Sequence, residues 1–425
     1  MYEPSSSIRD RVLTVGVAWG STRRFVVEEH LDELERLVDT AGGEVVDRAI
    51  QERRTLEPAT VVGAGFLERL ARTCVDEDIS LLVFDEDLTG SQVRNIERMV
   101  PDNVKILDRA GVILDIFALR ARTREAQTQV ELAQLTYLLP RLTRRWTHLS
   151  RQAGGIGTRG VGETQLEIDR RLISKKIAQL KARLAVIERD RRLRRQRRSA
   201  MPTLALVGYT NAGKSSLFRR LTRADVLIED RLFATLDPRT RRLNLGQGVA
   251  AVVVDTVGFV RKLPHDLVAP FRSTLEEAAE ADVVLHVVDR SHATWEEHLR
   301  VGHEILDDLE VEPERVLVVE NKMDLVGRGA LPGRSVESSS FQVSAATGRG
   351  VAELRVALRQ RLLSAPGVVV LRIPLEQSDA VRRAVDLPHQ VALRFEAEWM
   401  DVALRCDEQA LQQAGLQAFR VESWW

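Results

Sequence analysis

The 425-residue chain is poor in several residue types, and each scarcity excludes a class of protein. Its two cysteines, Cys74 and Cys406, are too few for a disulfide framework or a cysteine-based zinc site, and they fit a reducing compartment. The most apolar run, residues 249–260, is shorter than the roughly 18 residues that a membrane helix needs. The first residues lack the basic start and apolar run of a signal peptide. We therefore expect a cytoplasmic protein with no membrane anchor.

Net charge is also absent, because 62 basic residues balance 62 acidic ones, but the two signs are not spread evenly. Residues 141–198 hold 18 Lys and Arg against 5 Asp and Glu, and residues 189–198 alone hold seven arginines. Such a run is either a solvated helix face or a surface for an anionic polymer. Few aromatic side chains accompany it, so the sequence favours contact with nucleic-acid phosphates over base stacking.

The length and the alternation of patterns predict four domains. Residues 1–110 alternate strand-like and helix-like segments, which indicates a small α/β domain with a mostly parallel sheet. Residues 111–198 are expected to form a hairpin of long helices, residues 199–364 an α/β domain with buried parallel strands, and residues 365–425 a small α+β domain. In the first domain, strands are expected at 12–19, 43–50, 79–84 and 104–109, and helices at 28–41 and 65–75.

The predicted hairpin is antiparallel and has helices over residues 124–142 and 163–198. In the second helix, apolar residues recur at the steps of a coiled-coil seam, namely Leu166, Ile173, Ile177, Leu180, Leu184 and Ile187. Between the helices lies AGGIGTRGVGE, residues 153–163, with five glycines and Arg159. This segment is either a flexible linker or a tip whose backbone approaches a surface closely, and the second interpretation is favoured.

A phosphate-binding loop is the strongest signal in the chain. GYTNAGKS, residues 208–215, fits GxxxxGK[ST] and lies between the strand-like TLALV and the helix-like SSLFRRLT, which is the context that this motif requires. Backbone N–H groups of the loop and the helix N-terminus would hold the phosphates. Lys214 would reach the terminal phosphates, and the Ser215 hydroxyl would bind Mg²⁺.

Three shorter motifs follow in order, each at the C-terminal end of a predicted strand. DTVGF, residues 255–259, offers Asp255 to magnesium and the Gly258 N–H to a γ-phosphate. NKMD offers a buried Asp324 carboxylate to the N1–H and exocyclic amine of guanine, a donor pair that adenine lacks. SAATGRG, which begins at Ser344, would close over the base. Together with the phosphate-binding loop, these motifs predict a GTPase with GTP as its substrate.

The residues that act on water are harder to assign. Thr235 in FATLDPRTRR is the expected switch threonine for Mg²⁺, with Thr240 as the alternative. Phe259 stands where many GTPases place a water-orienting glutamine; because phenylalanine cannot hydrogen-bond water, intrinsic hydrolysis should be slow or use another group. Asn211 is either a ligand for K⁺ beside the phosphates or a turn residue that tolerates an unusual backbone. His298 and the next histidine, His303, are five residues apart, which does not match the four-residue spacing of two metal ligands on one helix face. We therefore expect His298 on a helix surface rather than at a zinc ion.

The full predicted site joins these motifs. The predicted nucleotide-binding residues are Gly208, Tyr209, Thr210, Asn211, Ala212, Gly213, Lys214, Ser215, Ser216, Phe233, Ala234, Thr235, Leu236, Asp237, Asp255, Thr256, Val257, Gly258, Asn321, Lys322, Met323, Asp324, Ser344, Ala345 and Ala346. Magnesium is assigned to Ser215, Thr235 and Asp255, and hydrolysis to Lys214, Thr235 and Gly258.

Longer motifs extend beyond the GTPase domain. They are LDRAGVILDIFALRARTREAQTQVELAQLTYLLPRL, residues 107–142, and GGIGTRGVGETQLEIDRR, residues 154–171, followed by GYTNAGKS, FATLDPRTRR, DTVGFVRKLP and NKMD. On these residues the chain resembles the HflX family of ribosome-associated GTPases. The resemblance implies the four domains above, Mg²⁺-dependent GTP hydrolysis stimulated by the ribosome, binding to the large ribosomal subunit and its ribosomal RNA, and splitting of stalled ribosomes. We expect a monomer and no DNA partner.

Three other functions are weighed against this one. The first is a GTPase that holds an immature large subunit during assembly. The second is an NTP-dependent factor that remodels ribosomal RNA with the first domain as its motor, for which no second phosphate-binding loop is visible. The third is a tRNA-modifying GTPase, which would need a further catalytic cysteine or cofactor domain that two scattered cysteines do not supply.

Overall fold

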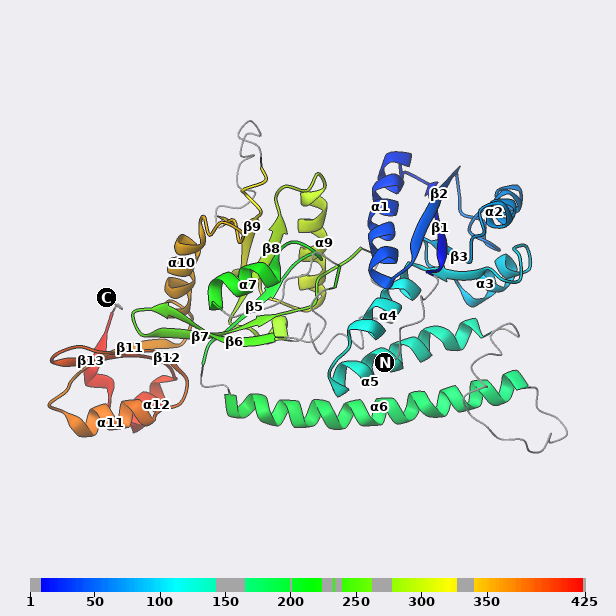
Figure 1. Ribbon diagram of the computed structural model, residues 1–425. Coiled ribbons are helices and arrows are strands. Elements are labelled where there is room, and N and C mark those ends of the chain that lie inside the picture. The colour runs from blue at the N-terminus through cyan, green and yellow to red at the C-terminus, as the bar shows by residue number, and fades with distance from the viewer. Residues whose placement is uncertain are drawn as a thin grey trace, which may run out of the picture. The chain divides into compact units, whose positions relative to one another are not determined.

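The protein is described by a computed structural model that covers residues 9–142, 165–198, 201–223, 232–233, 239–261, 277–326 and 340–422 (Figure 1). It divides into two compact units, whose described residues run from 9 to 187 and from 188 to 422. Each unit has its own sheet and its own hydrophobic core. Among the described residues, no helix combines the length and the hydropathy that crossing a bilayer takes.

The first unit begins with the predicted α/β domain. Its sheet has the order β2-β1-β3-β4, and every pairing is parallel. The elements are β1 (Arg11–Trp19), α1 (Arg24–Ala41), β2 (Glu44–Arg53), α2 (Ala64–Asp76), β3 (Leu81–Phe84), α3 (Gly90–Glu97), β4 (Lys105–Asp108) and α4 (Arg109–Arg120). All the predicted strands and helices of this domain are present, so the expected fold class is confirmed here.

Two helices of this domain were not expected from the sequence. Helix α3 begins at a capping box, in which the Thr89 hydroxyl accepts from the Gln92 N–H and the Gln92 side chain accepts from the Thr89 N–H. Helix α4 is capped at its N-terminus by Asp108, whose carboxylate accepts from the Gly111 N–H. Helix α4 is buried on most of its surface and therefore lacks the amphipathic pattern by which a surface helix is found.

A helical hairpin follows, made of α5 (Arg124–Leu138), the 3-10 turn η1 (Leu139–Arg141) and α6 (Gln165–Arg198). Figure 1 shows α5 and α6 side by side with opposite chain directions. Leu132 of α5 packs on Leu180 and Leu184 of α6, with Leu135, Ile177 and Ile187 around them, as the predicted seam requires. Ile173, also predicted for the seam, is half-buried but does not belong to this cluster. Leu166 and the glycine-rich segment lie outside the residues whose side chains are described.

The second unit contains the GTPase fold. Its elements are β5 (Thr203–Val207), α7 (Lys214–Thr222), β6 (Arg239–Gly246), β7 (Val249–Asp255), β8 (Val283–Asp289), α9 (Trp295–Asp308), η3 (Pro313–Arg315), β9 (Val316–Asn321), β10 (Phe341–Gln342) and α10 (Val351–Leu363). Strands β10, β9, β8, β5 and β7 form a parallel sheet in that order, and β6 pairs antiparallel with β7. The carboxyl ends of β5, β7, β8 and β9 therefore meet along one edge, where a nucleotide site is expected.

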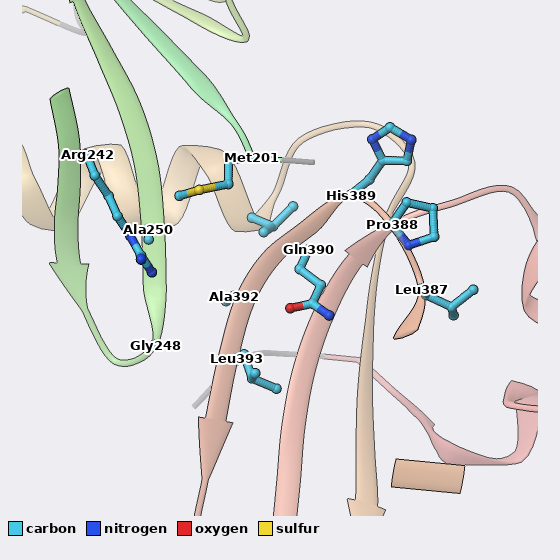
Figure 2. Close-up of a pocket in the computed structure, with 11 residues that line it drawn as sticks. Met201, Arg242, Gly248, Ala250, Leu387, Pro388, His389, Gln390, Ala392 and Leu393 are labelled. Carbon is cyan, nitrogen blue, oxygen red and sulfur yellow. The ribbon is translucent and has the colours of Figure 1, made fainter. Parts of the chain in front are cut away.

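The last domain is a small antiparallel sheet with helices, as predicted. Its elements are β11 (Val368–Pro374), α11 (Ser378–Asp386), β12 (Gln390–Phe395), β13 (Trp399–Arg405), α12 (Glu408–Gln413), η4 (Gln417–Phe419) and β14 (Arg420–Val421). Strand β12 joins the GTPase sheet, because Ala392 pairs with Val249 of β7 and the Leu393 N–H donates to the Gly248 carbonyl at 3.1 Å. A shared core and a pocket of about 380 Å³ lie at this junction, with Arg242 on one wall and Gln390 on the other (Figure 2).

Candidate functional site

The phosphate-binding loop connects β5 to α7, and two of its glycines are required by close neighbours. Gly208 has φ +137°, and a Cβ there would lie 2.1 Å from the carbonyl oxygen of Val287. Gly213 has φ +89°, and a Cβ there would lie 2.3 Å from Nδ2 of Asn321. Only glycine tolerates both the positive φ and the lack of room for a Cβ at these two positions. The loop is thus built against β8 and against the predicted base-binding motif at the end of β9.

Lys214 lies inside this loop rather than on its surface. Its side chain is 6% exposed, and Nζ donates to the carbonyl oxygens of Gly208 at 2.9 Å and Tyr209 at 2.8 Å. Burial lowers the pKa of Lys214 to about 8, although the nearby Asp255 carboxylate acts in the opposite direction. The loop therefore holds a cation ready for the phosphates while placing that cation near its titration point at neutral pH.

Two oxygen ligands of the kind that Mg²⁺ prefers lie together at the start of α7. The Ser215 hydroxyl donates to Oδ2 of Asp255 at 2.7 Å, and Asp255 is fully buried at the end of β7. A buried carboxylate beside a hydroxyl fits a hard divalent cation, which would bring both oxygens into its coordination shell. The Thr256 hydroxyl points elsewhere, since it donates to the Leu206 carbonyl of β5 at 2.7 Å.

The DTVGF segment is hydrogen-bonded to the phosphate-binding loop. The Phe259 N–H donates to the Gly208 carbonyl at 2.9 Å, and the Thr210 N–H donates to the Phe259 carbonyl at 2.7 Å. Gly258 lies where a Cβ would be 2.9 Å from Nζ of Lys214, so this segment passes directly over the lysine. The Phe259 ring is 3% exposed and packs in an apolar cluster with Tyr209, in keeping with the expectation that it does not orient water.

The base-binding motifs are joined by side-chain hydrogen bonds. Asn321 donates through Nδ2 to the Ala212 carbonyl at 2.9 Å and accepts from the Ala345 N–H at 3.0 Å, which ties the NKMD and SAATGRG motifs to the phosphate-binding loop. The Ser344 hydroxyl donates to Oδ1 of Asp324 at 2.5 Å. Asp324 itself is exposed, so the expectation of a buried carboxylate is wrong. The residue lies in the turn that follows β9, where the SAATGRG motif reaches it through Ser344.

Lys322 is held away from the core by an ion pair. Its Nζ lies 2.8 Å from Oδ2 of Asp289, the last residue of β8, and its backbone has φ +61°. Burial alone would raise the pKa of Asp289, but hydrogen bonds from Lys322 and Ser291 together lower that pKa below its ordinary value. The ion pair thereby fixes the Lys322 side chain to the end of β8.

Several predicted residues are not placed together by the structure. Ala234, Thr235, Leu236 and Asp237 lie outside the described residues, whereas Phe233 is described and buried. Thr240, the alternative switch threonine, lies in β6 opposite Val254, where its backbone belongs to a β-ladder. Asn211 is exposed and has φ +62°, a conformation that asparagine tolerates, which supports its interpretation as a turn residue without testing potassium binding.

Sequence reasoning missed a cluster behind the loop. The Tyr209 hydroxyl accepts from the Arg261 N–H at 2.8 Å, and the Tyr209 ring stacks on His298 at 3.9 Å between ring centroids. The expectation that His298 lies on a helix surface is therefore wrong, because this stacking buries it. Arg261 also pairs with Glu297 at 3.2 Å, so α9 holds Arg261, which lies two residues after the end of DTVGF. The sequence offered one signal for this cluster, the tyrosine that directly follows the first glycine of the phosphate-binding loop.

A second histidine, His286 of β8, is fully buried next to this cluster. Burial, reinforced by His303 and Lys214, lowers the pKa of His286 to about 3, so the ring is neutral at physiological pH. Gly302 makes room for it, because a Cβ at Gly302 would lie 2.1 Å from Nε2 of His286. The part of the chain that the structure describes has no group of three or more His, Cys, Asp or Glu side chains placed to hold a metal ion.

Comparison with known proteins matches three family profiles along the chain. "GTP-binding GTPase N-terminal" covers residues 28–118, "GTP-binding GTPase Middle Region" covers 120–198, and "50S ribosome-binding GTPase" covers 203–322. Similar curated proteins include "GTPase HflX" of Magnetococcus marinus, 48% identical over 83% of this chain and 82% of the relative. "GTPase HflX" of Escherichia coli is 42% identical over 88% of this chain and 87% of the relative.

Proposed function

The chain belongs to the HflX family of GTPases, and on that premise we propose that it binds the large ribosomal subunit and uses GTP to split stalled ribosomes into subunits. GTP hydrolysis is the activity of the family and of the site described above. The family profile matched by residues 203–322 names a ribosome-binding GTPase, and this supports the ribosome as partner. The observation that carries the proposal is a nucleotide site joined in one chain to a strongly basic helical hairpin.

In this proposal the nucleotide site works through the residues predicted from the sequence. The loop amides and Lys214 bind the phosphates, Ser215 and Asp255 hold Mg²⁺ together with Thr235, and Asp324 selects guanine. When bound, Mg²⁺ would neutralise the charge that develops on the phosphates. We retain Asn211 as a candidate ligand for K⁺, which predicts slower hydrolysis when Na⁺ replaces K⁺.

The hairpin is the proposed contact with ribosomal RNA. On α6, Lys175, Lys181 and Arg183 are exposed along the part of the helix whose side chains are described. Basic side chains of this kind hold phosphates and fix orientation without reading the base sequence. The glycine-rich segment, residues 153–162, would let backbone enter an RNA cleft in which side chains would clash. The whole arrangement acts as a monomer in which GTP binding fixes the docking of the hairpin.

The decisive experiment is sedimentation of intact ribosomes with the protein and GTP, a nonhydrolysable GTP analogue or GDP. We expect separated subunits with the GTP forms and intact ribosomes with GDP. Deletion of residues 153–162 should leave GTP binding near normal, abolish splitting and weaken ribosome binding only in part, because the basic helices remain. Full splitting by the deletion variant would contradict the proposal, and loss of GTP binding would show that the segment is structural.

Phosphate contact can be tested separately through salt dependence. Replacing Lys175 or Lys181 with alanine should reduce the slope of log affinity against log salt by about 0.7 to 1 for each lost contact. Arg361→Ala, which removes an exposed basic residue from α10, is the matched control and should leave the slope unchanged. Equal slopes for all variants would contradict the assignment of the hairpin to RNA.

The same experiments separate the alternatives. A subunit-assembly GTPase would bind free or immature large subunits and leave intact ribosomes whole. An RNA-remodelling factor driven by the first domain would hydrolyse ATP after Lys214→Ala has removed the GTPase.

A further inference from the structure

The end of α5 is fastened to the α/β domain by one buried carboxylate. Asp108, at the end of β4, is fully buried and accepts four hydrogen bonds. Two donors come from its own domain, the Leu88 N–H at 3.0 Å and the Gly111 N–H at 2.9 Å. The other two come from the end of the hairpin's first helix, the Tyr137 hydroxyl at 2.7 Å and NH2 of Arg141 at 2.9 Å. The carboxylate therefore serves both as the cap of α4 and as an anchor for η1.

Arg141 adds further contacts that hold the last turn. Its guanidinium lies 3.7 Å from the centre of the Tyr137 ring and donates to the Tyr137 carbonyl at 2.9 Å and to the Leu88 carbonyl at 2.6 Å. Burial, together with the charge of Asp108, raises the pKa of Tyr137 well above its ordinary value, so the phenol stays a hydrogen-bond donor. The side chains of Tyr137 and Arg141 thus form one unit with Asp108.

Two glycines of the α/β domain permit this close approach. A Cβ at Gly90, the first residue of α3, would lie 2.0 Å from the Pro140 carbonyl oxygen. A Cβ at Gly111, in the first turn of α4, would lie 2.8 Å from the Tyr137 hydroxyl. Neither glycine has a positive φ, so contact with η1 rather than backbone conformation is what restricts these positions. We call Asp108, Tyr137 and Arg141, with Gly90 and Gly111, the hairpin clamp.

The polar groups of the hairpin clamp lie outside one hydrophobic cluster of the α/β domain. That cluster is built from β1, β3, β4, α2, α3 and the loops between them, and it contains neither Tyr137 nor Arg141. Helix α5 is held along its length by its own buried residues, among them Val130 and Ala133. The polar contacts of the clamp are confined to the last turn, just before the chain enters residues 143–164, which contain the glycine-rich segment.

We propose that the hairpin clamp is a positioning device that holds η1, which ends at Arg141 just before the undescribed residues that include the glycine-rich segment, at a fixed place on the α/β domain. This inference rests on the proposed function, because the segment is taken to be the part that enters ribosomal RNA. Tyr137, Arg141 and Asp108 are positioning residues, since they touch neither nucleotide nor RNA in this account. A fixed departure point lowers the entropy that the segment loses on docking, so the clamp contributes to ribosome affinity without contacting the ribosome.

The test uses two mild variants of the full chain, Tyr137→Phe and Gly90→Ala. Tyr137→Phe removes one hydrogen bond to a charged group, and Gly90→Ala places a methyl group against the Pro140 carbonyl. Each should raise the Kd for ribosomes in the GTP state by about tenfold. Basal GTP hydrolysis and GTP affinity should stay as in the natural chain. Gly65→Ala is the matched control, because it is the same substitution in the same domain at a glycine with no atom within 4 Å of a Cβ.

The deletion of residues 153–162 separates a positioning role from a merely structural one. Tyr137→Phe should weaken ribosome binding in the full chain but add nothing to the partial weakening that the deletion causes alone. If both changes add, or if Tyr137→Phe and Gly90→Ala bind as well as Gly65→Ala, the positioning role is overturned. If the deletion by itself leaves affinity and splitting intact, the proposed function of the segment is contradicted. This result differs from the two results that would overturn the positioning role alone.

Discussion

Lys214 is a buried cation whose only described hydrogen-bond partners are backbone carbonyls, and its lowered pKa has a measurable consequence for nucleotide affinity. Bound phosphates favour the charged form, so GTP binding requires protonated Lys214. With a pKa of about 8 in the free protein, the protonated fraction falls as pH rises, and GTP affinity should drop by about tenfold between pH 7 and pH 9. Calorimetric titration at constant salt measures this.

Lys214→Arg is the control for that pH dependence, because a guanidinium stays protonated over this range. The variant should bind GTP more weakly at pH 7 but lose no further affinity up to pH 9 beyond what the nucleotide itself causes. A natural chain whose affinity does not change with pH would contradict a lysine that titrates near 8.

Asp324 should set the choice of base. An aspartate accepts two N–H groups from guanine, whereas an asparagine offers one donor and one acceptor, which suits the N1–H and C2 carbonyl of xanthine. Asp324→Asn should therefore shift preference from GTP to XTP, and selectivity for GTP should fall by about 10- to 100-fold, the effect of hydrogen bonds to a charged but exposed carboxylate. Competition binding with GTP, XTP and ATP measures it. Asp307→Asn, at an exposed aspartate of α9, should leave all three affinities unchanged.

At the scale of elements, the seam between α5 and α6 is small and should be sensitive to single truncations. Leu180 is 3% exposed against α5, so Leu180→Ala should destabilise the hairpin by about 2 kcal/mol or more. Leu172→Ala on the same helix is the matched control, because that side chain is 58% exposed. Hydrogen exchange along α6 measures the difference. Equal exchange in the two variants would show that α6 is stable without the seam.

The helices and strands differ in how well the sequence alone predicted them. Strands such as β1 and β8 are continuous apolar runs, and the seam of α6 is strictly periodic, so both were predicted. Strand β6 was missed because RTRRLNLG is rich in arginine, and its place follows from pairing with β7. Helices α3 and α4 were missed because one is short and the other is buried almost all round. In these cases tertiary contacts outweigh local pattern.

The candidate site divides in the same way. Each of the four nucleotide motifs lies at the C-terminal end of a strand. Their residues could therefore be predicted from the spacing of residue types within each motif. The contacts of Tyr209 with Arg261 and His298 join residues up to 89 positions apart and belong to no short motif. The wrong expectations for His298 and Asp324 have one cause, because burial depends on neighbours from other elements and not on local sequence.

At the scale of the molecule, the GTPase fold and the last domain depend on each other. Gly248, at the β6–β7 turn, would place a Cβ 2.1 Å from the Leu393 carbonyl oxygen of β12. Gly248→Ala should therefore destabilise the second unit by about 1 to 3 kcal/mol more than Gly246→Ala. Both glycines have a positive φ, +75° and +87°, and only an arginine side-chain end, at 3.5 Å, lies near a Cβ at Gly246. Denaturant unfolding of the two variants measures the difference. Equal losses in the free energy of unfolding would show that the junction accommodates the added methyl group without destabilisation.

The edges of the two sheets have a consequence for how the protein behaves in a crowded solution. Among the described residues, the larger sheet ends at β10 and β14, each of two residues, and β6 carries exposed arginines. The smaller sheet ends at β2, where Glu44, Asp47, Arg48 and Glu52 are exposed, and at the four-residue β4. Short or charged edge strands resist pairing with a second chain. Along the part of the chain that the structure describes, the sheet edges thereby resist open-ended growth into aggregates.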